Sequence, residues 1–289
     1  MANTGADEQI TDLEQNKDSY GQIVQSSSIM AGSASVTMLM SLARMKMAAL
    51  FIGSAGVGLV SVLSNLQLLI STLSGLGLQT SAVREIADAL GRGDHLAATR
   101  KVQTIRKISL LTGVVGMLAT ISLGGVLSVI TFGNSDYTID ISMLGVTVLL
   151  LNLAGAHLAT LQGMRRISSL AKVNALSAFA GTAITALLYY LFGLQAVAPS
   201  LVALSACQYF AARYFAFRVL WDVHTVVSWS EAYRTSGSLI KLGLALMWSS
   251  LVGQLSIVIL NAYITSTEGL QSTGTVSYTH LTLPTIYSV

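Results

Sequence analysis

Residues 57–78 read VGLVSVLSNLQLLISTLSGLGL, and this stretch decides the fold class. It runs for 22 residues without an Asp, Glu, Lys or Arg. A helix that crosses the hydrocarbon core of a bilayer needs about 20 mostly apolar residues. The stretch therefore predicts one membrane-spanning α-helix, and the rest of the chain repeats the pattern.

The whole chain has the composition of a membrane protein. Of its 289 residues, 53% are hydrophobic and 10% are charged, and the mean hydropathy is +0.66. Soluble domains carry about 25% charged residues, so this chain has too few charges to cover a soluble surface. We predict an all-α, polytopic membrane protein with about seven transmembrane helices, at Ile23–Ala43, Val57–Leu78, Ile108–Phe132, Ile141–Leu161, Val173–Leu194, Val197–Phe217 and Leu239–Ile264.

The basic residues predict the orientation of these helices, because Lys and Arg concentrate in the cytoplasmic loops of membrane proteins. Of the 16 basic residues, 13 lie around the connections between the second and third, fourth and fifth, and sixth and seventh spans. The loops 133–140 and 265–275 contain none. We therefore expect a cytoplasmic N-terminus with a polar tail at 1–22, and a cytoplasmic linker at 218–238.

Arg44 and Lys46 break this pattern, since they follow the first span and should lie on the outer side. An ionisable group at membrane depth costs about 2.5–3.5 kcal/mol on insertion scales unless it faces water or a partner. Two interpretations are open. Either both side chains snorkel to the interface at the end of the helix, or they line a cavity for an anionic substrate.

Polar residues recur inside the spans. Two spans carry a stripe on one helical face, namely Ser61, Asn65, Leu68 and Thr72 in the second span and Ser250, Gln254, Ile257 and Asn261 in the seventh. Asn152 and His157 add polar groups to the fourth span. Such groups must face protein or water. Interhelical hydrogen bonds would satisfy each one alone, but stripes on several helices favour a shared hydrated cavity. The candidate substrate contacts in it are Asn65, Asn152, Gln254 and Asn261, together with Arg44 and Lys46.

Several kinds of chemistry have no support in the sequence. The chain has one cysteine, Cys207, and no metal-ligand spacing, phosphate-binding loop or nucleophile elbow. The basic residues follow the membrane topology instead of forming a patch, so nucleic acid is not a predicted partner. We expect no catalytic residue, no metal and no cofactor.

The last fourteen residues, VSYTHLTLPTIYSV at 276–289, have neither a helical period nor membrane character. They resemble the translation of a transposase-adapter sequence used in DNA library preparation. We interpret this segment as non-native and exclude it from the fold. On this interpretation, residues 265–275 are the start of an outer loop, and we expect the natural sequence to be truncated within that loop.

Residues 20–94 carry a resemblance to a known family. They read YGQIVQSSSIMAGSASVTMLMSLARMKMAALFIGSAGVGLVSVLSNLQLLISTLSGLGLQTSAVREIADALGRGD. Four short motifs follow one another in this stretch: S-S-S-I at the start of the first span, R-x-K after it, the turn L-x-x-G-x-x-G-V-G-L, and G-L-G…S-x-V-R-x-I-A at the end of the second span. In this order and spacing, the stretch resembles the start of the Wzx-type O-antigen flippases of the multidrug/oligosaccharidyl-lipid/polysaccharide exporter superfamily.

The resemblance implies a fold of about twelve helices in two six-helix bundles around a central cavity. This chain would hold the first bundle at 23–217 and the first helix of the second at 239–264. The implied activity is translocation of a polyprenyl-diphosphate-linked glycan across the bacterial inner membrane by alternating access. Membrane lipid and a polysaccharide polymerase of the same pathway are further implied partners. The resemblance also assigns Arg44 and Lys46 to the family's basic pair, as contacts for the diphosphate or an acidic sugar.

Two other functions remain in competition. A multidrug or cation antiporter of the same superfamily would use acidic residues inside the membrane, and the predicted spans contain none in their interiors. A membrane-embedded polysaccharide polymerase or ligase would display a large outer loop with basic residues. The predicted outer loops are short and nearly uncharged, so both alternatives are weaker than the flippase.

Overall fold

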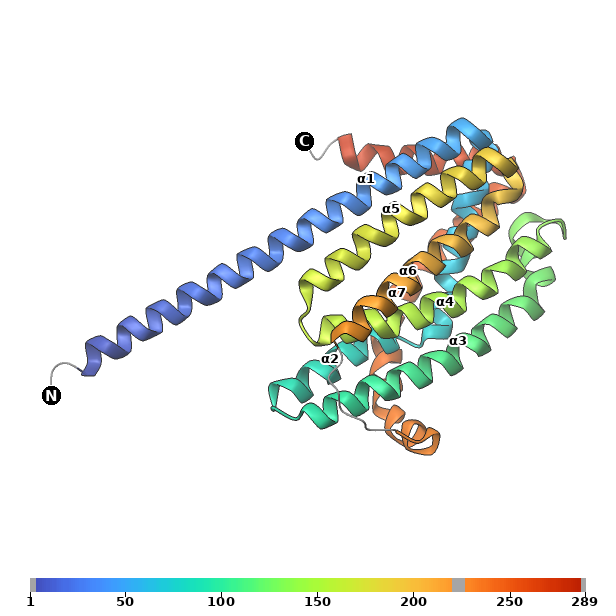
Figure 1. The fold of residues 1–289 in the computed structure, drawn as a ribbon. Coiled ribbons are helices and arrows are strands. Elements are labelled where there is room, and N and C mark those ends of the chain that lie inside the picture. The colour runs from blue at the N-terminus through green and yellow to red at the C-terminus, as the bar shows by residue number, and fades with distance from the viewer. Residues whose placement is uncertain (1–3, 220–226, 287–289) are drawn as a thin grey trace.

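The computed structural model describes residues 4–219 and 227–286, and within these ranges every regular element is a helix. The elements are α1 (Thr4–Gly75), α2 (Leu78–Gly91), α3 (His95–Phe132), α4 (Thr138–Gly163), α5 (Ile167–Phe192), the 3-10 helix η1 (Gly193–Ala196), α6 (Val197–Val219) and α7 (Trp229–Ile286). Helices α3 to α6 lie side by side, and α1 runs along α5 and extends beyond the bundle toward the N-terminus (Figure 1). The predicted all-α class is confirmed.

A sharp turn at Gly53 divides α1 into two helical arms. Gly53 has φ 69° and ψ −175°, a conformation that is essentially restricted to glycine. The chain reverses there, and the second arm returns into the bundle (Figure 1). The first span does not end at Ala43, as predicted, but continues to this turn. Arg44 and Lys46 therefore lie inside a helix, and the polar tail is helical from Thr4.

The connection between α1 and α3 is a short helix. Leu76 and Gly77, with φ 49° and 62°, end α1 and start α2. The carboxylate of Asp94 then accepts a hydrogen bond of 2.8 Å from the backbone N–H of Ala97. This cap starts α3 at His95, earlier than the predicted Ile108, because capping satisfies backbone N–H groups at a helix start. The basic segment predicted as a loop is thus largely helical.

Helix α7 differs more from the prediction. It begins at Trp229, before the predicted Leu239, and a second glycine turn at Gly269 (φ 83°, ψ 173°) bends the chain. The helix then continues to Ile286, so the segment from Val276, predicted to lack helical structure, is helical in the part that the structure describes. Residues 220–226 of the predicted linker lie outside the described residues.

Helix α7 makes two backbone-to-backbone contacts, one with the connection between α1 and α2 and one with the second arm of α1. At one, a methyl group on Gly243 would overlap the carbonyl oxygen of Leu76, and one on Gly77 would overlap that of Gly243. At the other, Gly58 and Gly274 face each other in the same way. Small residues allow helix backbones to approach this closely in membranes.

Five described segments are long and apolar enough to cross a membrane: Val24–Gly75, His95–Phe132, Thr138–Gly163, Ile167–Arg218 and Ser250–Val276. The two 52-residue segments each contain two predicted spans, one pair separated by the Gly53 turn and the other by η1. The seventh predicted helix, Leu239–Ile264, is only partly covered, because the fifth segment begins at Ser250 and Leu239–Trp248 is a separate, shorter apolar stretch.

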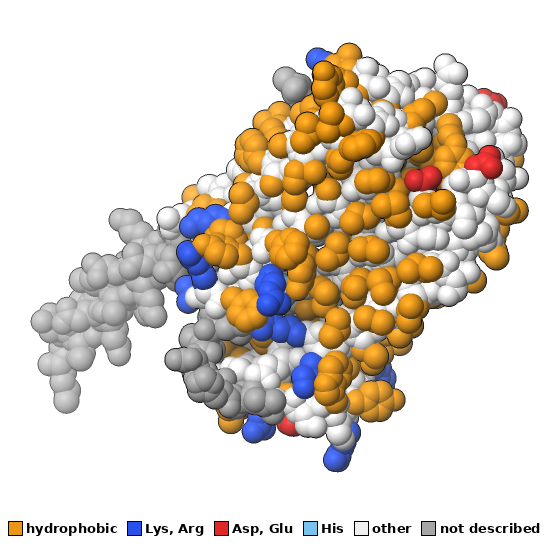
Figure 2. All heavy atoms as spheres, turned by 45° about the vertical axis from the view of Figure 1, so that its right-hand side comes forward, with side chains coloured by type: hydrophobic (Ala, Val, Ile, Leu, Met, Phe, Trp, Pro, Cys, Tyr) orange, Lys and Arg blue, Asp and Glu red, His pale blue; other side chains and the backbone are white. Residues whose placement is uncertain are grey.

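The surface agrees with a membrane location. Large apolar side chains are exposed along the helices, as at Ile130 of α3 (65%) and Phe210 of α6 (63%). Figure 2 shows them scattered over the middle of the molecule, while most of the visible Lys and Arg side chains gather toward the end where α2 lies. This separation matches an apolar band that faces lipid and a basic end that faces water.

Candidate functional site

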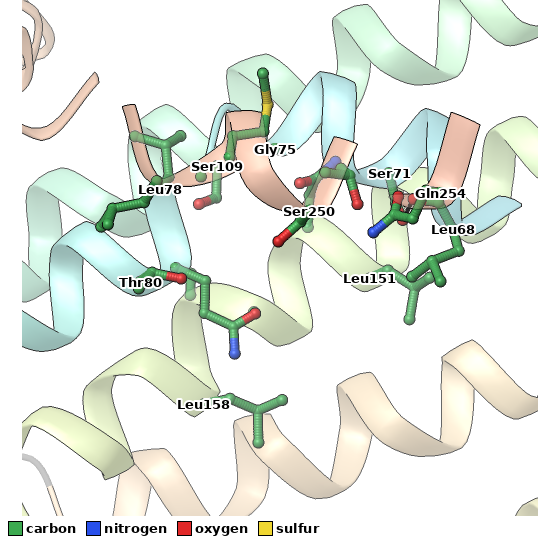
Figure 3. A pocket seen from close by; sticks show the side chains of 18 of the residues that line it. Leu68, Ser71, Gly75, Leu78, Thr80, Ser109, Leu151, Leu158, Ser250 and Gln254 are labelled. Carbon is green, nitrogen blue, oxygen red and sulfur yellow. Dashed lines mark hydrogen bonds between the residues drawn. The ribbon is translucent and has the colours of Figure 1, made fainter. Parts of the chain in front are cut away.

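A cavity of about 330 Å³ with a mixed polar and apolar lining, here called the central cavity, lies where helices distant in the sequence meet. Its polar lining consists of Ser71, Thr72, Gln79, Thr80, Ser109, Asn152, Gln208, Ser250 and Gln254. Figure 3 shows Ser250 and Gln254 of α7 close to Ser71 of α1, with Leu151 of α4 beside them. Hydroxyl and carboxamide groups thus converge within the membrane-spanning part of the chain.

Asn152 has two roles in this cavity. Its Nδ2 donates a hydrogen bond of 2.9 Å to Ser74 Oγ, which joins α4 to α1. Gly75 makes the approach possible, because a methyl group there would lie 2.8 Å from Asn152 Oδ1. The side chain therefore links two helices and also lines the central cavity.

Gln254 has an unmet hydrogen-bonding requirement. Its Oε1 is buried and has no hydrogen-bond partner among the described residues. A buried acceptor without a partner costs about 1–3 kcal/mol. Because Gln254 lines the central cavity, a sugar hydroxyl or a water molecule in that cavity would supply the missing donor.

A second cavity of about 330 Å³, here called the side cavity, lies between α1, α5 and α6. Arg44 and Asn65 both line it, because the Gly53 turn brings the two arms of α1 together. Tyr189 and Ser200 complete its polar wall, and Ser200 Oγ donates a hydrogen bond of 3.2 Å to the hydroxyl of Tyr189. Within the described ranges, no carboxylate forms an ion pair with Arg44.

Lys46 and Asn261 line neither cavity. Lys46 is exposed. Consecutive residues are about 100° apart around a helix, so Lys46 lies about 200° from Arg44 and cannot face the same side. Asn261 is buried, and its Nδ2 has no partner among the described residues. It lies on the same face of α7 as Gln254, but about 10 Å further along the axis.

Some lining residues were not predicted. Gln79 lies just beyond the second predicted span, and Tyr189 carries no polar pattern that marks it. Gln208 lies inside the sixth span, and the criterion that selected Asn152 would also have selected it. His157 is buried but lines neither cavity, and its ring centroid lies 5.9 Å from that of Tyr209.

The chemistry of the two cavities is neutral or cationic. Neither lining includes a carboxylate, and the described residues contain no group of three His, Cys, Asp or Glu that could hold a metal ion. Hydroxyl and carboxamide groups both donate and accept hydrogen bonds. The central cavity thus suits a hydroxyl-rich ligand, and the side cavity suits one that carries negative charge.

Comparison with known proteins agrees with this arrangement. The profile of a family described as polysaccharide biosynthesis protein matches residues 23–278. A solved structure described as the inward-facing conformation of a multidrug resistance MATE family transporter of the MOP superfamily is similar in fold, with a TM-score of 0.61 and 16% sequence identity. The similarity covers 82% of this chain and 56% of that chain, so this chain spans little more than half of that protein. A comparison with curated proteins finds no match.

Proposed function

The chain belongs to the polysaccharide biosynthesis protein family, and on that premise we propose that it is a flippase for an isoprenoid-diphosphate-linked oligosaccharide. The cargo is an O-antigen or related polysaccharide repeat unit. It moves from the inner to the outer leaflet of the bacterial inner membrane by alternating access. The N-terminus is cytoplasmic, and a polysaccharide polymerase of the same pathway receives the product.

The observation that carries the proposal is the central cavity, which has a polar lining without acid inside membrane-spanning helices. A glycan is strongly hydrated and cannot cross hydrocarbon, where polar groups have no hydrogen-bond partners. Nine hydroxyl or carboxamide side chains in the central cavity replace water around the sugar hydroxyls. The unpartnered Oε1 of Gln254 is one acceptor that is ready for such a contact.

Arg44 supports an anionic cargo. It lies about 14 Å along the helix axis from the Gly53 turn, so it is not at a helix end, where snorkelling would explain it. A fixed charge in a confined site acts through a lower effective dielectric than bulk water. The planar guanidinium also matches phosphate oxygens in two-point geometry. We assign Arg44 as the contact for the diphosphate or an acidic sugar, and Lys46 as a weaker, indirect contributor.

The main alternative is a multidrug or cation antiporter, which the similarity to a MATE transporter raises at the level of fold. A carboxylate would stabilise a cation in a membrane cavity, and neither cavity provides one in the described part of the chain. An enzyme such as a polymerase or ligase is weaker still, because the fold is similar to that of a transporter. The cavity chemistry therefore favours the glycan-lipid over the cation.

The test uses a strain whose surface polysaccharide depends on this protein, expressed from its complete gene. We expect Arg44→Ala to abolish surface polysaccharide at normal protein levels, and Arg44→Lys to restore part of it. Lys46→Ala is the matched control, since it removes the same charge from the opposite face of the helix, and it should reduce export much less. Normal export by the Arg44→Ala/Lys46→Ala double variant would eliminate the cationic contact. Transport of organic cations by the wild-type protein, without glycan export, would support the antiporter instead.

A further inference from the structure

A third hollow lies on the face that α5 and α6 share, outside the two cavities. This α5–α6 groove has a volume of about 1130 Å³, which is at the upper end of sites for small molecules. Its walls are mainly apolar, with Leu176 and Ile184 from α5 and Ala203, Ala206 and Phe210 from α6. A hydrocarbon chain could lie along it without exposing a polar group of the protein.

One end of the groove is strongly basic. Arg213 and Arg218 line it near the C-terminal end of α6. The Arg213 guanidinium lies 4.8 Å from the centroid of the Phe217 ring, and Arg106 of α3 lies 5.0 Å from the same centroid, so the two guanidinium carbons are less than about 10 Å apart. Arg218 stacks on Tyr214 at 4.4 Å. Arg106 does not line the groove, so we call Arg213 and Arg218, which do, the arginine cluster.

No acid balances this cluster within the described ranges. The ion pairs there are Arg92–Asp88 and Lys101–Glu85, neither of which involves the cluster. The Nε and Nη2 atoms of Arg106 are buried and have no hydrogen-bond partner among the described residues. Like charges at this separation repel, and more strongly where water is excluded. An anion at this end of the groove would offset the repulsion between Arg106 and Arg213.

From this juxtaposition of an apolar groove with an arginine cluster, we propose that the α5–α6 groove is a docking site for the isoprenoid diphosphate end of the cargo. The isoprenoid chain lies in the groove, and the diphosphate lies on the cluster. The inference rests on the proposed function. It adds a binding site for the cargo before translocation, separate from both cavities, at the basic end of the molecule. A diphosphate matches the two guanidiniums of the cluster better than the single charge of a phospholipid phosphodiester does, because guanidinium–phosphate pairs form two parallel hydrogen bonds.

The test measures binding of farnesyl diphosphate to the purified complete protein in detergent. Inorganic pyrophosphate lacks the chain, farnesol lacks the charge, and phosphatidylglycerol vesicles offer a phosphodiester as competitor. Arg213→Gln/Arg218→Gln removes both charges that line the groove, and Ala206→Trp fills the groove while it keeps every arginine. Arg166→Gln is the matched control, because it removes an exposed charge outside the groove.

We expect farnesyl diphosphate to bind at least tenfold more tightly than pyrophosphate or farnesol. The Arg213→Gln/Arg218→Gln and Ala206→Trp variants should each lose at least tenfold in affinity, and Arg166→Gln should lose none. Equal binding by the wild type and the Ala206→Trp variant would overturn the proposal, as would displacement by phosphatidylglycerol at concentrations comparable to the diphosphate. If binding is unaffected while export still depends on Arg44, only the docking site is wrong. If export does not depend on Arg44 either, the proposed function falls as well.

Discussion

The hydrogen bond between Asn152 and Ser74 makes it possible to separate a structural role from a substrate contact. Both Asn152→Ala and Ser74→Ala remove this 2.9 Å bond, but only Asn152→Ala removes a carboxamide from the central cavity. Interhelical hydrogen bonds in membrane proteins contribute about 0.6 kcal/mol on average and about 1.7 at most. Each variant should therefore lose a similar, small amount of stability, equal to about a threefold change in the folding equilibrium for the average bond.

Export should separate the two variants. A hydrogen bond to the moving glycan that contributes about 1.4 kcal/mol corresponds to a tenfold change in rate. We expect Asn152→Ala to reduce surface polysaccharide at least tenfold per inserted protein, and Ser74→Ala to reduce it less than threefold. Immunoblots normalise for protein, and thermal unfolding in detergent checks that both variants are equally destabilised. Equal loss of export in the two variants would refute the contact and leave Asn152 as a packing residue.

Two further predictions concern the fold and its orientation. A methyl group added at Gly53 or at Gly32 would have no neighbour within 4 Å, but only Gly53 has positive φ. Gly53→Ala should therefore lower the stability by about 1–3 kcal/mol, and Gly32→Ala should raise it by up to about 1 kcal/mol. Equal unfolding temperatures of the two variants would show that alanine at the turn is not strained. The second prediction concerns the orientation and uses a Cys207→Ala background. Ser135→Cys should react with an impermeant maleimide on intact cells, and Ala97→Cys should react only after permeabilisation. The reverse pattern would show that the N-terminus lies outside.

The number of spans could be predicted because each long apolar run is visible in the sequence. The ends of the helices could not be predicted in this way. The apolar run stops at Arg44, yet the helix continues through Met45–Ile52, whose residues mostly favour helix, until Gly53 permits a reversal. At the other extreme, α3 begins at His95 because Asp94 caps it. Capping residues and glycines determine where a helix begins and ends, whereas hydropathy indicates only where the apolar part of the helix ends.

The candidate site was only partly accessible from the sequence. The opposite placement of Arg44 and Lys46 follows from helical geometry alone, so a single contact could have been expected in place of a pair. Arg44 and Tyr189 share one cavity, and Asn152 and Gln254 share the other. Both pairings depend on how α1, α4, α5 and α7 pack. Periodicity places a residue on a face of its own helix but does not say which helix that face meets.

The glycine contacts of α7 have a mechanical consequence. Where Gly77 meets Gly243, and where Gly58 meets Gly274, the atoms nearest to an added methyl group are all backbone atoms. Packed helices shear past each other by small sliding movements, and interlocked side chains must change rotamer to allow this. At these two contacts no rotamer barrier opposes a displacement along the helix axis, whereas separation would lose close van der Waals contact. At these two points, one on each side of the Gly269 turn, small shifts of α7 need no change of rotamer at the glycines, so the nearby walls of the central cavity can move while backbone contact is kept.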